Sequence, residues 1–264
     1  MDDELWARIE PLLPVVPRNP RRPGRKGLES RRVLCGILFV LYTGIRWEFL
    51  PQELDFGSGM TCWRRLRDWN EAGVWQQLHE LMLCELRVAD LLDFARAAVD
   101  SSHIHAMKGG SASGPSRVDR GKAGSKHHLI VEAHGIPLAA ITTGGNRNDV
   151  TQLIPLIQAV PPIRGKRGQP LRRPKHLYAD RGYDHEVYRD KVHRCQITPH
   201  LARPGTGHGS GLGVYRWVVE GAIALVHWFR RLRTLWEIRD DIHHAFVTLG
   251  CAVICWRGLR TALC

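Results

Sequence analysis

The apolar side chains in the first third of the chain repeat at the spacing of an α-helix. They recur between residues 28 and 92, as in Val33, Ile37, Leu38 and Leu41, and again in Val74, Leu78, Leu81, Met82 and Leu86. Steps of three and four residues place such side chains on one face of a helix. A glycine turn at residues 56–59 precedes Thr61, whose hydroxyl we expect to cap a further helix that runs to Trp69. The pattern predicts a helical domain over residues 1–92.

Beyond residue 93 the pattern changes to short apolar runs separated by turns. Strands are expected at residues 94–105, 126–133, 136–143, 175–180 and 195–201, with a two-residue turn at His134 and Gly135. Helices are expected at residues 149–160, 185–193, 215–237 and 241–259. Strands come first as a meander and then alternate with helices, which favours an α/β domain over residues 93–264, with a mixed sheet covered by helices.

The charge of the chain is strongly positive. It has 264 residues with 38 Lys+Arg against 26 Asp+Glu, a formal net charge of +12, and 44% hydrophobic residues, a composition that excludes general disorder. Basic residues gather at 18–32, 63–67, 164–175 and 230–233. Any one cluster has the ordinary interpretation of a solvated surface, but four together favour a polyanion as partner, because each phosphate that is neutralised releases counterions. No cluster lies on a strongly amphipathic basic helix, which disfavours a membrane surface.

Membrane insertion and secretion are not expected. The longest apolar runs, at residues 33–42 and 245–256, are shorter than the roughly 20 residues that cross a bilayer. The chain starts Met-Asp-Asp-Glu, where a secretory signal would be basic and then apolar. Seven cysteines without a Cys-x-x-Cys pair fit reduced thiols. We therefore expect a cytoplasmic protein.

The helix expected after the glycine turn carries three arginines. Arg64 and Arg67 share one of its faces with Arg65 beside them, while Leu66 and Trp69 point elsewhere. A helix of this kind is similar to the recognition helix of a helix-turn-helix unit, in which arginines read guanine in the major groove. Surface helices with arginines are also common in proteins that do not bind DNA.

Three acidic residues stand in apolar surroundings. Asp100 follows the run 97–99, Asp180 ends the run 176–179, and Glu220 is the single acid in a largely apolar helical segment. A buried carboxylate is unfavourable unless a cation offsets it. Each acid alone could be a cap or the partner of an arginine. Three of them in one half of the chain suggest convergence, and hard oxygen ligands suit Mg²⁺ or Mn²⁺.

The same segments carry a family resemblance. Residues 45–51, 56–66 and 69–75 resemble the N-terminal domain of bacterial insertion-sequence transposases of the insertion-sequence-five group. Residues 99–102, 179–184, 216–220 and 229–232 resemble the successive blocks of that group's catalytic domain. The resemblance implies a ribonuclease-H-like fold for the second domain, with Asp100, Asp180 and Glu220 at the positions of the DDE metal-binding acids.

The activity that the resemblance implies is DNA cleavage and strand transfer. Two Mg²⁺ or Mn²⁺ ions about 4 Å apart support in-line displacement at a phosphodiester, with Asp100 bridging both and Asp180 and Glu220 holding one each. The expected partners are the double-stranded terminal inverted repeats and target DNA, held by a homodimer. The residues expected to contact DNA are Arg64, Arg65, Arg67, Arg216, His227, Arg230 and Arg231.

The chain also departs from the family pattern around its last acid. Arg216 and Glu220 fit, but Leu212 stands at the usual Tyr position and His227 at the usual Lys position. Gly221 follows the acid, and residues 205–213 contain no Lys or Arg. Two alternatives therefore stay open: a weakened or inactive transposase-derived DNA-binding protein, and a plain nuclease of the same fold.

Overall fold

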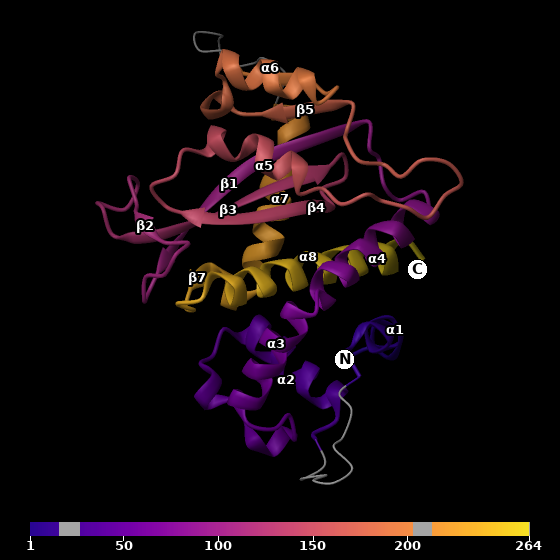
Figure 1. Ribbon diagram of the computed structural model, residues 1–264, viewed down its shortest axis with the longest axis vertical. Coiled ribbons are helices and arrows are strands. Elements are labelled where there is room, and N and C mark those ends of the chain that lie inside the picture. Colours follow the sequence, from indigo (N-terminus) through magenta and orange to yellow (C-terminus); the bar gives the residue numbers. More distant parts are fainter. Residues whose placement is uncertain (16–26, 203–212, 264) are drawn as a thin grey trace.

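Helices fill the N-terminal part of the computed structural model, which describes residues 1–15, 27–202 and 213–263 (Figure 1). They are α1 (Asp3–Ile9), α2 (Ser30–Thr43), α3 (Gly59–Glu71) and α4 (Val74–Val88), with 3₁₀ turns η1 (Glu10–Leu12), η2 (Trp47–Phe49) and η3 (Gln52–Leu54). The prediction of a helical segment before residue 93 is confirmed.

Helix α3 begins differently from the expectation. The hydroxyl of Ser58 accepts a hydrogen bond from the Thr61 N–H at 3.2 Å, so Ser58 is the N-cap and Thr61 already lies in the first turn. The extended backbone of Ser58 aims its hydroxyl at the free N–H groups of that turn. Gly59 follows because a Cβ there would lie 1.8 Å from the carbonyl oxygen of Trp47.

The sheet is mixed. Strands β1 (Arg96–Ala106), β3 (Ala123–Glu132) and β4 (Pro137–Gly144) are antiparallel, whereas β5 (His176–Ala179) and β6 (Thr198–Leu201) continue from β1 in parallel. The short strands β2 (Gly114–Pro115) and β7 (Thr234–Leu235) pair with β3 and β1. Residues 133–136 join β3 to β4, a longer turn than the two residues expected, with Gly135 at a φ of 88°.

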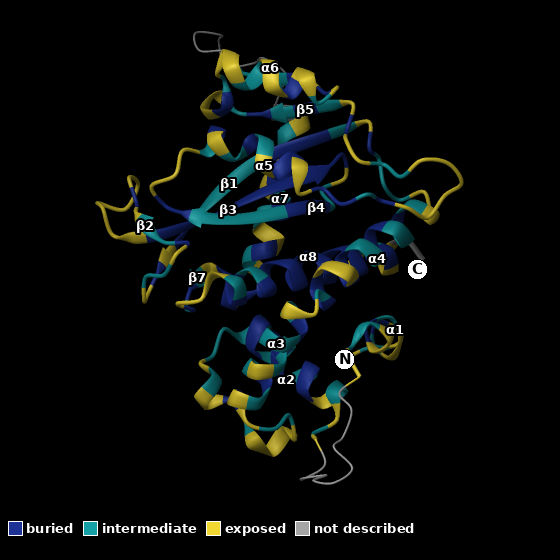
Figure 2. Cartoon of the chain, viewed as in Figure 1, coloured by how far each residue is buried: buried dark blue, intermediate teal, exposed yellow. Residues whose placement is uncertain are grey.

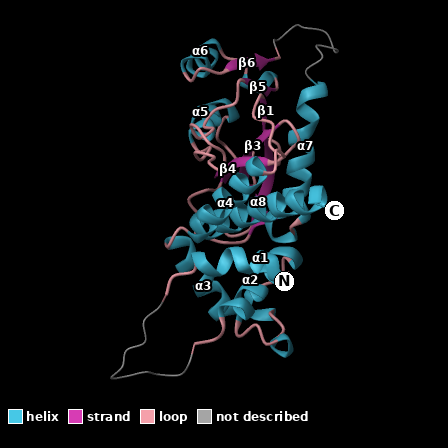
Figure 3. Cartoon of the chain, turned by 90° about the vertical axis from the view of Figure 1, so that its right-hand side faces the viewer, coloured by secondary structure: helices cyan, strands magenta, loops and turns pink. Residues whose placement is uncertain are grey.

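Helices cover both faces of this sheet. They are α5 (Leu153–Gln158), α6 (Glu186–Arg194), α7 (Gly213–Trp228) and α8 (Asp240–Leu263), with 3₁₀ turns η4 (Asp149–Gln152), η5 (Arg181–Tyr183) and η6 (Arg230–Arg233). In the side view α7 lies on one side of the strands, and α5 and α6 lie on the other (Figure 3). Helix α7 packs against β1, β3 and β5. The fold is the mixed α/β arrangement expected, a mixed sheet covered by helices.

The helix expected over residues 215–237 ends earlier. Helix α7 stops at Trp228, the buried Phe229 is extended, and η6 leads into β7. The reason is a tertiary pairing, because Thr234 and Leu235 align in parallel with His105 and Ala106 at the end of β1. Local periodicity could not reveal that strand.

One hydrophobic core joins the N-terminal helices to the sheet. Helix α8 packs against α4, α3 and β4, and it is largely buried in Figure 2. Within the described residues, its segment Asp240–Thr261 is long and apolar enough to cross a membrane, but 83% of that window is buried inside the protein, as in a core helix. The division into domains at residues 92 and 93 stays a prediction.

Candidate active site

Asp100 lies in the middle of β1, between the buried Val99 and the half-buried Ser101. Its Oδ2 lies 3.7 Å from Nη2 of Arg216 on α7. Two residues along the strand, the hydroxyl of Ser102 is 3.2 Å from Nε2 of His227, also on α7. Alternate residues of a strand share a face, so the face of β1 that carries Asp100 is the face that α7 covers.

Asp180 follows the neighbouring strand β5. The parallel register pairs Ala98 with Tyr178, and the same register extended by two residues sets Asp180 beside Asp100. The Asp180 carboxylate caps η5 by accepting the Gly182 N–H at 2.9 Å. The side chain is half-buried at the carboxyl end of the strand, where polar groups of parallel sheets gather.

Glu220 lies on α7, one helical turn after Arg216, and its side chain is exposed. The negative charge of Glu220 repels that of Asp100. Burial raises the pKa of Asp100, and repulsion from the carboxylates of Asp180 and Glu220 raises it further, while the Ser101 N–H and Arg216 lower it. A cation bound near Asp100 would offset the repulsion among the three carboxylates.

The three carboxylates are not spaced as a finished metal site. Across residues 1–15, 27–202 and 213–263, no group of three or more His, Cys, Asp or Glu side chains is arranged to hold an ion. The carboxylate oxygens are the hard donors that Mg²⁺ and Mn²⁺ prefer. The residue types therefore fit these ions, although the carboxylates lie too far apart to hold an ion in this structure. Arg216 lies next to Asp100 and supplies the positive charge that offsets it here.

The arginines of α3 have two kinds of surroundings. Arg64 is exposed, Arg65 is half-buried, and neither has an ion pair with any described residue. Arg67 pairs with Asp68 at 2.6 Å and with Glu71 at 3.8 Å, and it also lies over the ring of Trp63. Leu66 and Trp69 are buried on the opposite side, as the helical pattern predicted.

The residues expected to contact DNA after Glu220 also include both exposed and internally paired side chains. Arg230 is exposed, but Arg231 is 3% exposed, pairs with Glu237 and donates to the carbonyl of Ile45 at 2.9 Å. The charge of Arg231 is therefore used inside the protein and does not lie on the surface, and its contact with DNA stays a prediction. His227 is half-buried, and burial followed by the charge of Arg233 lowers its pKa. Residues 203–212, which include most of the loop at 205–213 and Leu212, lie outside the described part of the chain.

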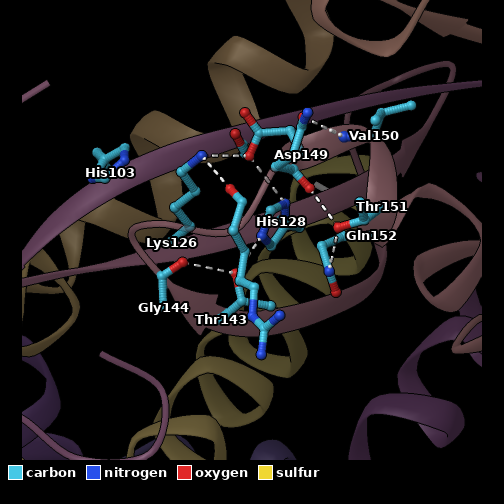
Figure 4. A network of polar contacts seen from close by, with 12 residues as sticks. His103, Lys126, His128, Thr143, Gly144, Asp149, Val150, Thr151 and Gln152 are labelled. Carbon is cyan, nitrogen blue, oxygen red and sulfur yellow. Dashed lines mark hydrogen bonds and ion pairs between the residues drawn. The ribbon is translucent and has the colours of Figure 1, made fainter. Parts of the chain in front are cut away.

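A polar network that the sequence did not single out lies on the other face of the sheet (Figure 4). Lys126 donates to the Asp149 carboxylate and to the carbonyl of Arg147, both at 2.9 Å. His128 is 2.8 Å from the hydroxyl of Thr143, and burial lowers its pKa to about 4. Lys126 and His128 pair across the sheet with His103 and Ser101 rather than with Asp100, so this network supports the strands from the opposite side.

The hydroxyl of Tyr183 is influenced both by the acids at 100 and 180 and by Asp149 of the polar network. Burial raises its pKa, and the charges of Asp149, Asp100 and Asp180 raise it further. In the sequence, the one indication that Tyr183 lies near the acids is its position three residues after Asp180. Its ring is 2% exposed and forms part of the core below the acids.

Family comparisons account for most of the chain. Residues 1–79 match the family described as "Putative transposase of IS4/5 family", and residues 94–256 match the "Transposase DDE domain". The second match covers the sheet, all three acids and most of α8. The chain belongs to the DDE transposase family of insertion sequences.

A curated relative agrees with this assignment. The chain is 59% identical over 149 residues to the "Putative transposase for insertion sequence element IS402" of Burkholderia cepacia, across 56% of this chain and 71% of that protein. Among solved structures, the Mos1 transposase paired-end complex with left transposon end aligns over 96% of this chain and 86% of that chain, with 12% identity and a TM-score of 0.31.

Proposed function

We propose that this transposase binds the terminal inverted repeats of an insertion sequence, cleaves the DNA and joins the freed 3′-hydroxyl to target DNA. One observation carries the proposal: in a chain of the DDE family, Asp180 follows the strand next to the one that holds Asp100, and Glu220 lies on the helix α7 that covers the same face of the sheet. Carboxylate oxygens are the ligands that Mg²⁺ and Mn²⁺ prefer, so acids that approach one position from two strands and a helix would bind such ions once their spacing closes around them.

In the proposed site Asp100 would bridge two Mg²⁺ or Mn²⁺ ions, with Asp180 and Glu220 holding one each. Such ions, when bound, activate an attacking oxygen and stabilise the leaving oxygen of a phosphodiester. Arg216 balances the charge of Asp100 and would release it as cations bind. Asp180 is held at its N-cap position by the Gly182 N–H, which fixes one carboxylate oxygen and leaves the other for a ligand.

DNA would be held mainly by the arginine side chains that form no ion pair with a described residue. Arg64 and Arg65 on α3 suit base reading or phosphate contact, with Arg67 next to them, and Arg230 suits phosphate contact. Arg216 and His227 line the α7 face, where they would position the DNA end near the acids. A homodimer would hold two element ends, and the protein would act in the bacterial cytoplasm on nucleoid DNA.

The test is a cleavage and joining assay on DNA that carries the terminal repeats of the element. With Mg²⁺ or Mn²⁺ the wild-type protein should cut the element end and join it to a target plasmid, and EDTA should abolish both. Asp100→Asn should lower the rate by at least about 10²-fold because it removes a carboxylate shared by both ions. Asp190→Asn changes an exposed acid on α6 and should leave the rate unchanged.

Two outcomes would overturn the proposal in favour of the alternatives. Binding of the repeats without cleavage, unchanged by Asp100→Asn, would indicate a transposase-derived DNA-binding protein. Metal-dependent cutting that never yields joined products would indicate a plain nuclease.

A further inference from the structure

A cavity of about 850 Å³ lies where the N-terminal helices meet the end of β1. Its walls come from η2, the first turn of α3, residues 107–108 after β1, and the segment that joins β7 to α8. None of the three proposed catalytic acids lines it. Its volume is in the range that ligand sites use.

Three indole rings line the cavity, from three separate segments: Trp47, Trp63 and Trp236. Trp47 is fixed from behind by stacking on Phe246, with ring centroids 5.7 Å apart and planes inclined by 19°. Aromatic walls of this kind bind flat rings by stacking, and every nucleobase presents such a face.

The floor of the cavity is a buried ion pair with unused hydrogen-bonding atoms. The side chains of Arg231 and Glu237 are 4% and 6% exposed and pair with each other. Among the described residues, no partner reaches Nε of Arg231, Oε2 of Glu237 or Nε1 of Trp47. These three atoms are covered by the surrounding protein, so a polar ligand would reach them only where the Arg231–Glu237 pair shifts. Together they offer two donors and one acceptor.

The rim is cationic. Apart from the floor pair, the cavity is lined by Arg46, Lys108 and Arg239 against Glu48, and Arg239 is paired with Glu71 and Asp241. Lys108 is exposed and has no ion pair within the described part of the chain, while Arg46 is exposed and 3.5 Å from Glu48. A ligand that places an aromatic ring among the indoles would therefore meet positive charge at its outer end.

We propose that this cavity binds a single nucleotide, with its base stacked among Trp47, Trp63 and Trp236 and its phosphate at the rim near Lys108. The edge of the base has both donors and acceptors, and it would reach the unpaired atoms of the Arg231–Glu237 floor through a shift of that pair. The nucleotide is either free or extrahelical in bound DNA, since enzymes that act on DNA rotate nucleotides out of the stack. Binding of an extrahelical nucleotide rests on the proposed function, whereas binding of a free nucleotide does not.

Tryptophan fluorescence of the purified full chain tests this site without any cleavage step. Each of the four deoxynucleoside 5′-monophosphates is titrated in turn, and deoxyribose 5-phosphate serves as the base-free probe. At least one nucleotide should quench the fluorescence saturably, and the base-free probe should not. Absence of saturable quenching by all four nucleotides would overturn the proposal.

Variants locate the binding. Trp236→Ala should weaken the binding of the quenching nucleotide by about tenfold or more, because one stacking wall is lost. Glu237→Gln should weaken it as well, and Lys108→Ala tests the rim with an exposed side chain whose loss leaves folding intact. Lys122→Ala removes the same charge outside the cavity and should leave the dissociation constant unchanged. Equal affinity in Trp236→Ala and Lys108→Ala would contradict the assignment.

A competition experiment distinguishes the two sources. If terminal-repeat DNA, once bound, prevents quenching by the free nucleotide, and Lys108→Ala weakens the DNA complex, the nucleotide in the cavity belongs to the DNA. If nucleotide quenching is the same with and without DNA, the ligand is a free nucleotide. A chain inactive in cleavage would still show the quenching, so failure of the proposed function and failure of this site are separable.

Discussion

Arg230 and Arg231 are neighbours in the sequence with opposite surroundings in the fold. Arg230 is exposed, whereas Arg231 is buried among Trp47, Trp236 and Phe246 and pairs with Glu237. The sequence analysis assigned both residues the same role, because the surroundings of Arg231 include a hydrogen bond to Ile45, 186 positions away. Side-chain environments that arise from such distant contacts cannot be read from a local cluster of charges.

The two arginines should therefore differ sharply in their effect on stability. Arg231→Met should lower the free energy of unfolding by about 3–5 kcal/mol, because Glu237 is left as a buried charge without a partner. Arg230→Ala should change it by less than about 0.5 kcal/mol. Urea denaturation of both variants measures the difference, and similar values for the two would contradict the environments described.

Gly221, next to the proposed catalytic Glu220, has no structural need to be glycine. It lies inside α7, its φ is not positive, and a Cβ would meet no atom within 4 Å. Gly221→Ala should therefore raise the free energy of unfolding by about 0.5–1 kcal/mol, because alanine loses less backbone entropy in a helix. Thermal denaturation would show this, and a destabilised variant would mean that the residue is constrained by contacts absent from this structure.

At the scale of elements, the helix that carries Arg64 and Arg65 depends on its first turn. Ser58→Ala should lower the free energy of unfolding by about 1 kcal/mol, because an N–H at the helix start loses its acceptor. Thr61→Ala should have a smaller effect, since its hydroxyl contacts only the side chain of Ser58, at 2.9 Å. A larger loss for Thr61→Ala would restore the expectation from the sequence that Thr61 is the cap.

Most elements were predictable because their apolar patterns are local. The strands at β1, β3, β4, β5 and β6 and the helices α2, α4 and α6 lie close to the positions expected from periodicity. The prediction was wrong where the chain leaves α7, because β7 forms only through pairing with β1, far away in the sequence. The positions of Asp100 within a strand and of Asp180 after one were likewise predictable, whereas the distances between the acids depend on how α7 lies on the sheet.

At the scale of the whole molecule, buried neutral histidines should make stability depend on pH. Burial lowers the pKa of His79 and of His128 to about 4, and that of His243 to about 3. The unfolded chain binds these protons below its usual histidine pKa of about 6.5, whereas the folded chain does so only near pH 3–4. Stability should therefore be fully present above about pH 6.5 and fall as the pH falls toward 4.

The expected loss between pH 7.5 and pH 5 is about 1–2 kcal/mol for each such histidine. Urea denaturation at the two pH values measures it. His79→Gln keeps a donor for the carbonyl of Pro137 and should flatten the dependence, while His185→Gln changes an exposed ring and should not. A free energy of unfolding that is constant over this interval would contradict the neutral state of the buried rings.

Asp100, Asp180 and Glu220 should share divalent cations when the protein engages DNA. Fe²⁺ can replace Mg²⁺ in such sites and, with ascorbate and peroxide, cuts the backbone next to its ligands. In the presence of terminal-repeat DNA, we expect cuts beside residues 100, 180 and 220 that excess Mg²⁺ suppresses and that Asp100→Asn removes at all three positions. Cuts confined to one of the three positions, or cuts that persist unchanged in Asp100→Asn, would contradict this expectation.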